Sequence, residues 1–268
     1  MGTKISKYKF YFMRHGETIY NSIKDKSAKY NPLYADCHLS NEGILQSKSK
    51  QSFFNKLDIE AIYVSPYYRA IQTMQYCLET HPNADKIIAY IHPNLAELSG
   101  MIHEFILDIK ETKKDFNMNS KVKIDWSYFD EYAKKSKYDE NFLFFENMNF
   151  LDEKIKEEKY LKLKSLYDKG DIQKYKDETG RLLKENLTPN TRFESFKHSY
   201  ERFEEFKKYL LHEFKDTINN KEQKILCICH SAFISIATSP YPFLKDDVKE
   251  TREHLFHPKN AEIISIFF

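Results

Sequence analysis

The chain has 268 residues, 41% of them hydrophobic and 15% aromatic, enough to bury the core of one large domain or of a domain with a sizeable insertion. Its 42 basic and 40 acidic residues leave a net charge of +2, which argues against nucleic-acid binding through bulk charge. The four cysteines show neither metal-ligand spacing nor a disulfide framework, and no stretch has the length and apolarity of a transmembrane helix. These features indicate a cytoplasmic protein.

The first six residues fit the N-myristoylation pattern, with Gly2 as the acceptor. The alternative is a polar lead-in to the first strand. A single acyl chain gives only weak, reversible membrane binding. We therefore expect weak membrane association if Gly2 is acylated, and none otherwise.

Residues 8–18 begin with an apolar and aromatic run that predicts a buried strand. The run ends in Arg14-His15-Gly16, where glycine would allow a sharp turn and the close approach of a ligand. The carboxyl end of such a strand is the usual ligand edge of an α/β sheet. Arginine suits phosphate oxygens and a neutral imidazole is a nucleophile, so these side chains could hold a phosphoryl group and attack it.

The next segment predicts a helix capped by Ser40 that runs to about Asn55, followed by a strand over residues 60–64. Ser65 would cap a further helix with Pro66 at its first position. Arg69 would then fall in the first turn and point back toward the edge of the sheet.

A third strand is predicted over residues 86–91, and it leads to Glu97. From about residue 99 to residue 192 the pattern changes to helical periodicity rich in Lys, Glu, Tyr and Phe. Gly170 would separate two helices, and Trp126 would anchor the packing of this segment. The pattern indicates a helical insertion or cap.

The last third begins with an amphipathic helix over about residues 191–215. A continuous apolar run then predicts a buried strand that delivers His230 at its carboxyl end. Ser231 would cap a helix that begins near Ala232, so that backbone N–H groups point at the same place. Residues 260–268 predict a final strand.

Five separated motifs together resemble the histidine phosphatase superfamily, which includes the phosphoglycerate mutases. The resemblance covers residues 8–97 and 191–268, in the expected order, and the middle third carries no family signature. The motifs are Arg14-His15-Gly16 with Asn21, Leu39-Ser40-x-x-Gly43-x-x-Gln46, Ser65-Pro66-x-x-Arg69-Ala70-x-x-Thr73, Leu95-x-Glu97, and the strand that ends at His230.

The resemblance implies a three-layer α/β fold with a mostly parallel sheet flanked by helices and a helical cap insertion. Residues 1–98 and 193–268 would form the phosphoglycerate mutase-like core, and residues 99–192 the cap. It also implies a phosphohistidine intermediate on His15 and a proton donor at Glu97, with Glu104 as a second candidate. The phosphate would be held by Arg14, Asn21, Arg69, His230, Ser231 and Ala232. We expect no metal and no cofactor, because cationic side chains would neutralise the phosphate charge.

Three functions remain open. The first is a phosphatase that releases inorganic phosphate, the second a cofactor-dependent phosphoglycerate mutase, and the third a non-catalytic phospho-ligand or protein-interaction module. Loss of Arg69 or His230 would favour the third, but both are present. Residues 98–105 contain no arginine, where the mutases carry a pair, and this favours the phosphatase. The expected partner is a phosphorylated small molecule or phosphopeptide, and not a nucleic acid.

Overall fold

The computed structural model describes residues 8–24, 31, 34–98, 102–106, 108–147, 151–186, 194–214, 223–239 and 255–267. The acylation motif at Gly2 lies outside these residues. So do the expected limits of the cap at 99 and 192, the expected end of the long helix at Lys215, and the last residue of the final strand, Phe268.

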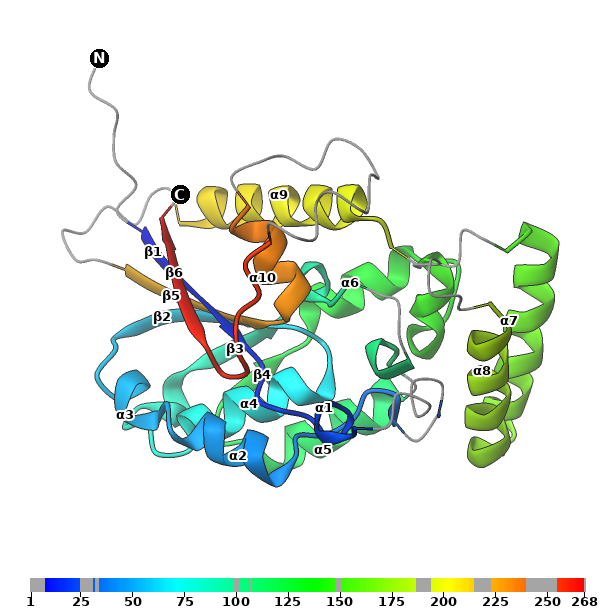
Figure 1. Cartoon of the computed structure of the whole chain (residues 1–268), viewed down its shortest axis with the longest axis horizontal. Helices are drawn as coiled ribbons and strands as arrows, with labels where there is room; N and C mark the ends of the chain where they lie inside the picture. Colours follow the sequence, from blue (N-terminus) through cyan, green and yellow to red (C-terminus); the bar gives the residue numbers. More distant parts are fainter. Residues whose placement is uncertain are drawn as a thin grey trace, which may run out of the picture.

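A six-stranded sheet with the order β4-β3-β2-β5-β1-β6 forms the centre of the described chain (Figure 1). Neighbouring strands are parallel except for β6, which runs antiparallel to β1 at one edge. This arrangement confirms the predicted α/β class. The strands are β1 (Tyr8–Arg14), β2 (Ile59–Val64), β3 (Ile88–Ile91), β4 (Lys123–Asp125), β5 (Gln223–Cys229) and β6 (Ile263–Phe267).

Helices cover both faces of the sheet (Figure 1). One face carries α9 (Phe196–Glu213) and α10 (Ser231–Ala237). The opposite face carries α2 (Asn41–Lys48), α3 (Gln51–Phe54), α4 (Tyr68–Leu78) and α5 (Ile109–Asn119). The remaining helices are α1 (Ile19–Ser22), α6 (Ser127–Lys135), α7 (Glu153–Asp168) and α8 (Ile172–Asn186), with short 3-10 helices η3 (Ala84–Lys86), η4 (Pro93–Leu95), η5 (Ile102–Glu104) and η6 (Glu140–Asn147).

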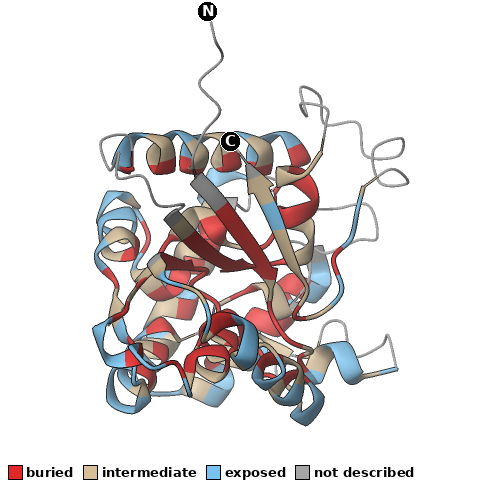
Figure 2. Cartoon of the chain, turned by 90° about the vertical axis from the view of Figure 1, so that its left-hand side faces the viewer, coloured by how far each residue is buried: buried red, intermediate tan, exposed pale blue. Residues whose placement is uncertain are grey.

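The central strands are buried on both faces, as Figure 2 shows for the middle of the sheet. Because side chains alternate along a strand, Phe10 and Phe12 pack with α9 and α10, whereas Tyr11 and Met13 pack with α4 and α5. This is why the strands read as continuous apolar runs in the sequence rather than as alternating ones. Cys227 and Cys229 share the α9 face.

The segment expected as a helical cap divides by its packing into two parts. Ile109 and Phe116 of α5 join the core under the sheet, and β4 pairs with β3. The sequence predicted only helices here, and this was wrong because a strand of three residues is too short to leave a pattern. Trp126 also packs in this core rather than in a separate cap.

The second part, from Tyr138 to Leu183, packs in a different hydrophobic cluster, which also includes Phe105 and contacts Tyr20 and Tyr34. Phe142, Phe145, Tyr160 and Tyr175 lie at its centre. Gly170 separates α7 from α8 with a φ of 77°, a left-handed conformation that favours glycine. In Figure 1 these two helices stand at one end of the molecule. The domain limits themselves stay a prediction.

Two element limits differ from the sequence prediction. The single helix expected from Ser40 to Asn55 is two helices, because the chain turns at Ser49 and Lys50, where the Ser49 hydroxyl donates to the Gln46 carbonyl at 2.6 Å. The strand expected from Lys86 begins at Ile88, because Lys86 ends η3.

All four cysteines are buried and none forms a disulfide. Within the described ranges, no helix combines the length and the apolarity that a bilayer crossing requires.

Phe206 tests the packing of α9 on the sheet. Its ring is fully buried and lies 5.6 Å from the ring of Tyr63 and 4.8 Å from that of His92. We expect Phe206→Ala to lower the free energy of unfolding by about 3–5 kcal/mol in a urea titration, because it leaves a cavity. Leu45→Ala on α2 is the control, since that side chain is 63% exposed, and it should change the free energy by less than about 0.5 kcal/mol. Similar losses for both variants would contradict this packing.

Candidate active site

Three parallel strands end at the same edge of the sheet and bring three polar residues together. His15 follows β1, Ser65 follows β2 and His230 follows β5. The backbone hydrogen bonds between the strands extend one residue beyond β1 and β2. The His15 N–H donates to the Cys229 carbonyl at 3.0 Å, and the Ser65 N–H donates to the Ile228 carbonyl at 2.9 Å. The positions of these side chains are therefore fixed by the register of the sheet.

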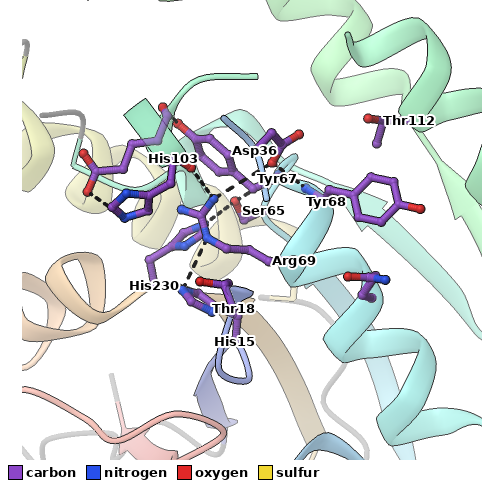
Figure 3. Close-up of polar contacts among 12 residues, drawn as sticks. His15, Thr18, Asp36, Ser65, Tyr67, Tyr68, Arg69, His103, Thr112 and His230 are labelled. Atoms are coloured by element: carbon purple, nitrogen blue, oxygen red, sulfur yellow. Dashed lines mark hydrogen bonds and ion pairs between the residues drawn. The ribbon is translucent and has the colours of Figure 1, made fainter. Parts of the chain in front are cut away.

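The His15 ring is held in one tautomer. Its Nδ1 lies 2.7 Å from the Gly16 carbonyl oxygen, which can only accept, so Nδ1 carries the proton. Nε2 is then an unprotonated nitrogen, and it accepts from Nε of Arg69 at 3.3 Å (Figure 3). Burial, together with the charges of Arg69 and Arg14, holds the pKa of His15 well below its usual range. The result is a neutral imidazole whose unprotonated Nε2 faces the Arg69 guanidinium.

Gly16 is required by packing, and the ligand approach predicted from the sequence stays a prediction. A Cβ at this position would lie 2.5 Å from the Gly43 carbonyl oxygen, so α2 could not approach the loop after β1. The Gly16 N–H also donates to Oγ1 of Thr73 at 3.0 Å, which ties this loop to α4. The glycine thus sets the position of the carbonyl that orients His15.

Arg69 lies in the first turn of α4 and only 1% of it is exposed. Its guanidinium lies over the Tyr67 ring at 4.4 Å, and NH1 donates to the His103 carbonyl at 2.8 Å. The carboxylate of Asp36 is 3.9 Å from NH1. These contacts place the guanidinium between His15 and the chain segment around His103 (Figure 3).

Among the residues that the structure describes, two buried nitrogens of the site have no hydrogen-bond partner. His230 is fully buried and its Nε2 lies 2.7 Å from Oγ of Ser65, but its Nδ1 has no partner among them. Arg14 donates through NH1 to the Pro258 carbonyl at 2.9 Å, but its buried Nε has no partner in the described part of the chain. Buried polar atoms rarely stay unpaired in folded proteins, so we expect Nδ1 of His230 and Nε of Arg14 to bind an acceptor on a ligand. A phosphate oxygen has the required chemistry.

The electrostatics of His230 resemble those of His15. Burial is the main cause that holds the pKa of His230 well below its usual range, and the charges of Arg69 and His15 lower it further. The ring is therefore neutral at physiological pH and lies 5.1 Å from the His15 ring. If the Ser65 hydroxyl donates to Nε2, Nδ1 carries the proton and can donate to an anion.

Glu97 follows η4 and is 8% exposed. Burial raises the pKa of its carboxyl, although hydrogen bonds from the Leu98 and Ala232 N–H groups and the charges of Arg69 and Arg14 oppose this. The protonated form therefore persists to a higher pH than for an exposed glutamate. Such a group can donate a proton.

Glu104, the second candidate for the proton donor, lies in η5. Its Oε1 is 3.7 Å from Nε2 of His103, and its backbone carbonyl accepts from the Tyr67 hydroxyl at 2.6 Å. Glu97 and Glu104 line the same cavity. Both residues therefore remain candidates for the proton donor by position, and burial raises the pKa of Glu97.

The helix caps expected at Ser65 and Ser231 were wrong. Helix α4 begins at Tyr68, with Tyr67 as its N-cap, because the Ser65 hydroxyl bonds to His230 instead. Helix α10 begins at Ser231 itself, with His230 as its N-cap. The Ala232 N–H forms a hydrogen bond with Glu97. The expected phosphate contacts of Ser231 and Ala232 stay a prediction.

Asn21 is exposed on α1, and its side-chain oxygen accepts from the N–H and the hydroxyl of Thr18 at 3.2 and 2.9 Å. It therefore acts as part of a capping box. Its expected place beside a phosphate stays a prediction.

Several residues of the site were missed by the sequence analysis. Ser65 and Tyr67 lie inside the motif that holds Arg69, so the motif itself could have indicated them. No sequence pattern indicated Asp36. Its carboxyl faces Arg69, and burial raises the pKa of this carboxyl to about 7. The side chain of Arg202 is 12% exposed, and its NH1 donates to the carbonyls of Asn94 and Ala96, which fixes the loop that carries Glu97.

In the residues that the structure describes, no group of three or more His, Cys, Asp or Glu side chains could hold a metal ion. The charged groups nearest His15 are guanidiniums, which suit an anion rather than a cation.

Part of the chain resembles a known protein family. The model of the histidine phosphatase superfamily (branch 1) matches residues 10–134. This confirms the resemblance and extends it into the middle third, where the sequence analysis found no signature. No curated protein sequence matches the chain.

Solved structures with a similar fold are distant in sequence. A phosphoglycerate mutase from Bacillus anthracis str. Sterne is 15% identical, with a TM-score of 0.50, and the alignment covers 97% of this chain and 88% of that one. An ecdysone phosphate phosphatase from Bombix mori, in complex with tungstate, is 12% identical, with a TM-score of 0.50 and coverage of 96% and 88%. A mycobacterial hydrolase is 15% identical, with a TM-score of 0.50 and coverage of 96% and 81%. These likenesses concern the fold.

The raised pKa of Glu97 leads to a test of its role. Glu97→Gln should slow a primary alkyl phosphate by roughly 10²–10⁴-fold and an aryl phosphate far less, because a phenolate leaves without a proton. For the wild type, activity on the alkyl ester should fall as the pH rises through the raised pKa, since the proton is lost; the aryl ester should lack this limb. Glu104→Gln is the matched comparison in steady-state kinetics. A selective loss on alkyl esters in that variant, and not in Glu97→Gln, would move the role to Glu104.

Proposed function

The chain resembles the histidine phosphatase superfamily over residues 10–134 and shares its α/β fold, and on this premise we propose that it is a phosphomonoester phosphatase with a phosphohistidine intermediate. One observation carries the proposal. Nε2 of His15 is an unprotonated nitrogen, held by the bond from Nδ1 to the Gly16 carbonyl and directed at Arg69. A nucleophile beside a cationic oxygen-binding group is what phosphoryl transfer requires.

In the first step, Nε2 of His15 attacks phosphorus and the bond from phosphorus to the ester oxygen breaks. Arg14, Arg69 and His230 bind the equatorial oxygens, whose charge would otherwise oppose the attack. Glu97 transfers its proton to the departing alkoxide, so the alcohol leaves neutral and Glu97 becomes a carboxylate. The imidazole now carries the phosphoryl group and a positive charge.

In the second step, water attacks phosphorus while the Glu97 carboxylate takes its proton. The bond between phosphorus and Nε2 breaks, inorganic phosphate leaves, and His15 returns to the neutral tautomer that the Gly16 carbonyl holds. Glu97 is again protonated, so each group ends the cycle as it began.

A phosphoglycerate mutase would use the same intermediate but return the phosphoryl group to a bound acid. It needs cationic groups for the substrate carboxylate, and residues 98–105 contain no arginine. Glu104, with its side chain 12% exposed, would repel that carboxylate. This observation favours the phosphatase over the mutase. A non-catalytic module is disfavoured because His15, Arg69, Glu97 and His230 are all present.

The substrate we propose is a phosphorylated small molecule or a phosphopeptide, and the cell compartment the cytoplasm. Four buried, unpaired cysteines suit a reducing environment. Acylation of Gly2 would add weak, reversible membrane association.

The test is phosphate release by the wild type, His15→Ala and His212→Ala on a panel of phosphomonoesters. His212 is an exposed histidine on α9 and serves as the matched control. We expect release to fall to background in His15→Ala and to be unchanged in His212→Ala, with the same circular dichroism for all three. Turnover that persists in His15→Ala would contradict the proposal. Conversion of 3-phosphoglycerate to 2-phosphoglycerate that outruns phosphate release would make the protein a mutase.

A further inference from the structure

Ser65 and His230 lie side by side because their strands are neighbours in the sheet. Ser65 follows β2 and His230 follows β5, and these strands pair in parallel with Val64 opposite Ile228. Both residues are fully buried, and Oγ of Ser65 lies 2.7 Å from Nε2 of His230 (Figure 3). The register of two central strands therefore holds this contact.

The hydroxyl of Ser65 can meet His230 in two ways, because a hydroxyl has one proton and two lone pairs. One lone pair of Oγ accepts from the Tyr67 N–H at 3.5 Å. If the hydroxyl proton points at Nε2 of His230, the neutral ring carries its own proton on Nδ1. If Nε2 donates to the hydroxyl instead, Nδ1 is a bare nitrogen. The direction of this one hydrogen bond thus decides what His230 offers to a ligand.

The charges around His230 favour the first arrangement when an anion binds. Burial first, and then nearby charges that include Arg69 and Arg14, hold the pKa of the ring well below its usual range, so the ring keeps one proton. Nε2 already contacts Ser65, and Nδ1 is the ring nitrogen left for a ligand. An anion attracted by the two guanidiniums would be repelled by a bare Nδ1 and bound by an N–H.

His15 has the opposite kind of partner. Its Nδ1 donates to the Gly16 carbonyl, which can only accept, so its Nε2 stays unprotonated. The hydroxyl of Ser65 can donate, so His230 can present an N–H where His15 presents a lone pair. The two rings lie 5.1 Å apart and are both neutral, yet one suits attack on phosphorus and the other suits binding of an oxygen.

Resting on the proposed function, we propose that Ser65 is a positioning residue whose hydroxyl donates to Nε2 of His230 and so keeps a proton on Nδ1 for a phosphate oxygen. Ser65 acts through His230 and not on the phosphoryl group itself. Without the hydroxyl, the ring stays neutral but its proton is free to move to Nε2. The phosphate then loses one of its donors in the bound state and in the transition state.

A double-mutant cycle on kcat/KM tests whether Ser65 acts through His230. We expect Ser65→Ala to lower kcat/KM by about 10–100-fold, the range found when the group that orients a metal-binding histidine is removed. In a His230→Ala background, the same change should cost less than about twofold. Thr179→Val is the control. It also removes a buried hydroxyl, which donates to the Tyr175 carbonyl on α8 at 2.9 Å, and kcat/KM should stay unchanged.

The tautomer of His230 is a readout that a purely structural role of Ser65 would not change. Proton–nitrogen NMR spectra of protein with labelled histidine distinguish a protonated ring nitrogen from a bare one. We expect the wild type to carry the His230 proton on Nδ1, both free and with inorganic phosphate bound. In free Ser65→Ala, the proton should appear at least in part on Nε2, and inorganic phosphate should bind about 10–100-fold more weakly.

The outcomes separate this inference from the proposed function. A wild-type His230 protonated on Nε2 with phosphate bound, or an equal cost of Ser65→Ala with and without His230, would overturn the inference and leave the phosphatase in place. If no phosphomonoester is hydrolysed, the proposed function fails, and the spectra and phosphate binding still decide the role of Ser65. The wild-type spectra also decide it if Ser65→Ala does not fold.

Discussion

The hydrogen bond from Nδ1 of His15 to the Gly16 carbonyl is the interaction on which the site depends. It fixes the proton on one nitrogen and leaves the other to react. The bond exists because Gly16 lets α2 pack against the loop, with the Gly43 carbonyl where a Cβ would otherwise lie, and because Thr73 of α4 holds the Gly16 N–H. Two helices from one face of the sheet thus set the chemistry at its edge.

Burial acts in opposite directions on the acid and on the nucleophile. It lowers the pKa of His15 and raises the pKa of Glu97, so each group tends toward its neutral form. In the proposed mechanism, a neutral imidazole attacks and a neutral carboxyl donates a proton. The guanidiniums of Arg14 and Arg69 would supply the attraction for phosphate. Burial in one site would thus support different roles for these groups.

The strand ends were predictable because long apolar runs mark buried strands, and parallel strands must present their carboxyl ends at one edge. The N-caps at Ser65 and Ser231 were not, because a serine after a strand can bond either to a helix or to a side chain from elsewhere. Arg202 and Asp36 could not be found, since each acts through a partner distant in sequence. The strand β4 was hidden by its length of three residues. Sequence patterns report local preference, whereas these features depend on tertiary contacts.

The position of the phosphoryl group on His15 tests the central claim most directly. Rapid acid-free quenching during turnover, followed by phosphorus NMR of the isolated phosphopeptide, distinguishes the two ring nitrogens. Because Nδ1 carries the proton bonded to the Gly16 carbonyl, phosphate should be attached to Nε2. Phosphate on Nδ1, or on a residue other than His15, would contradict this account of the site.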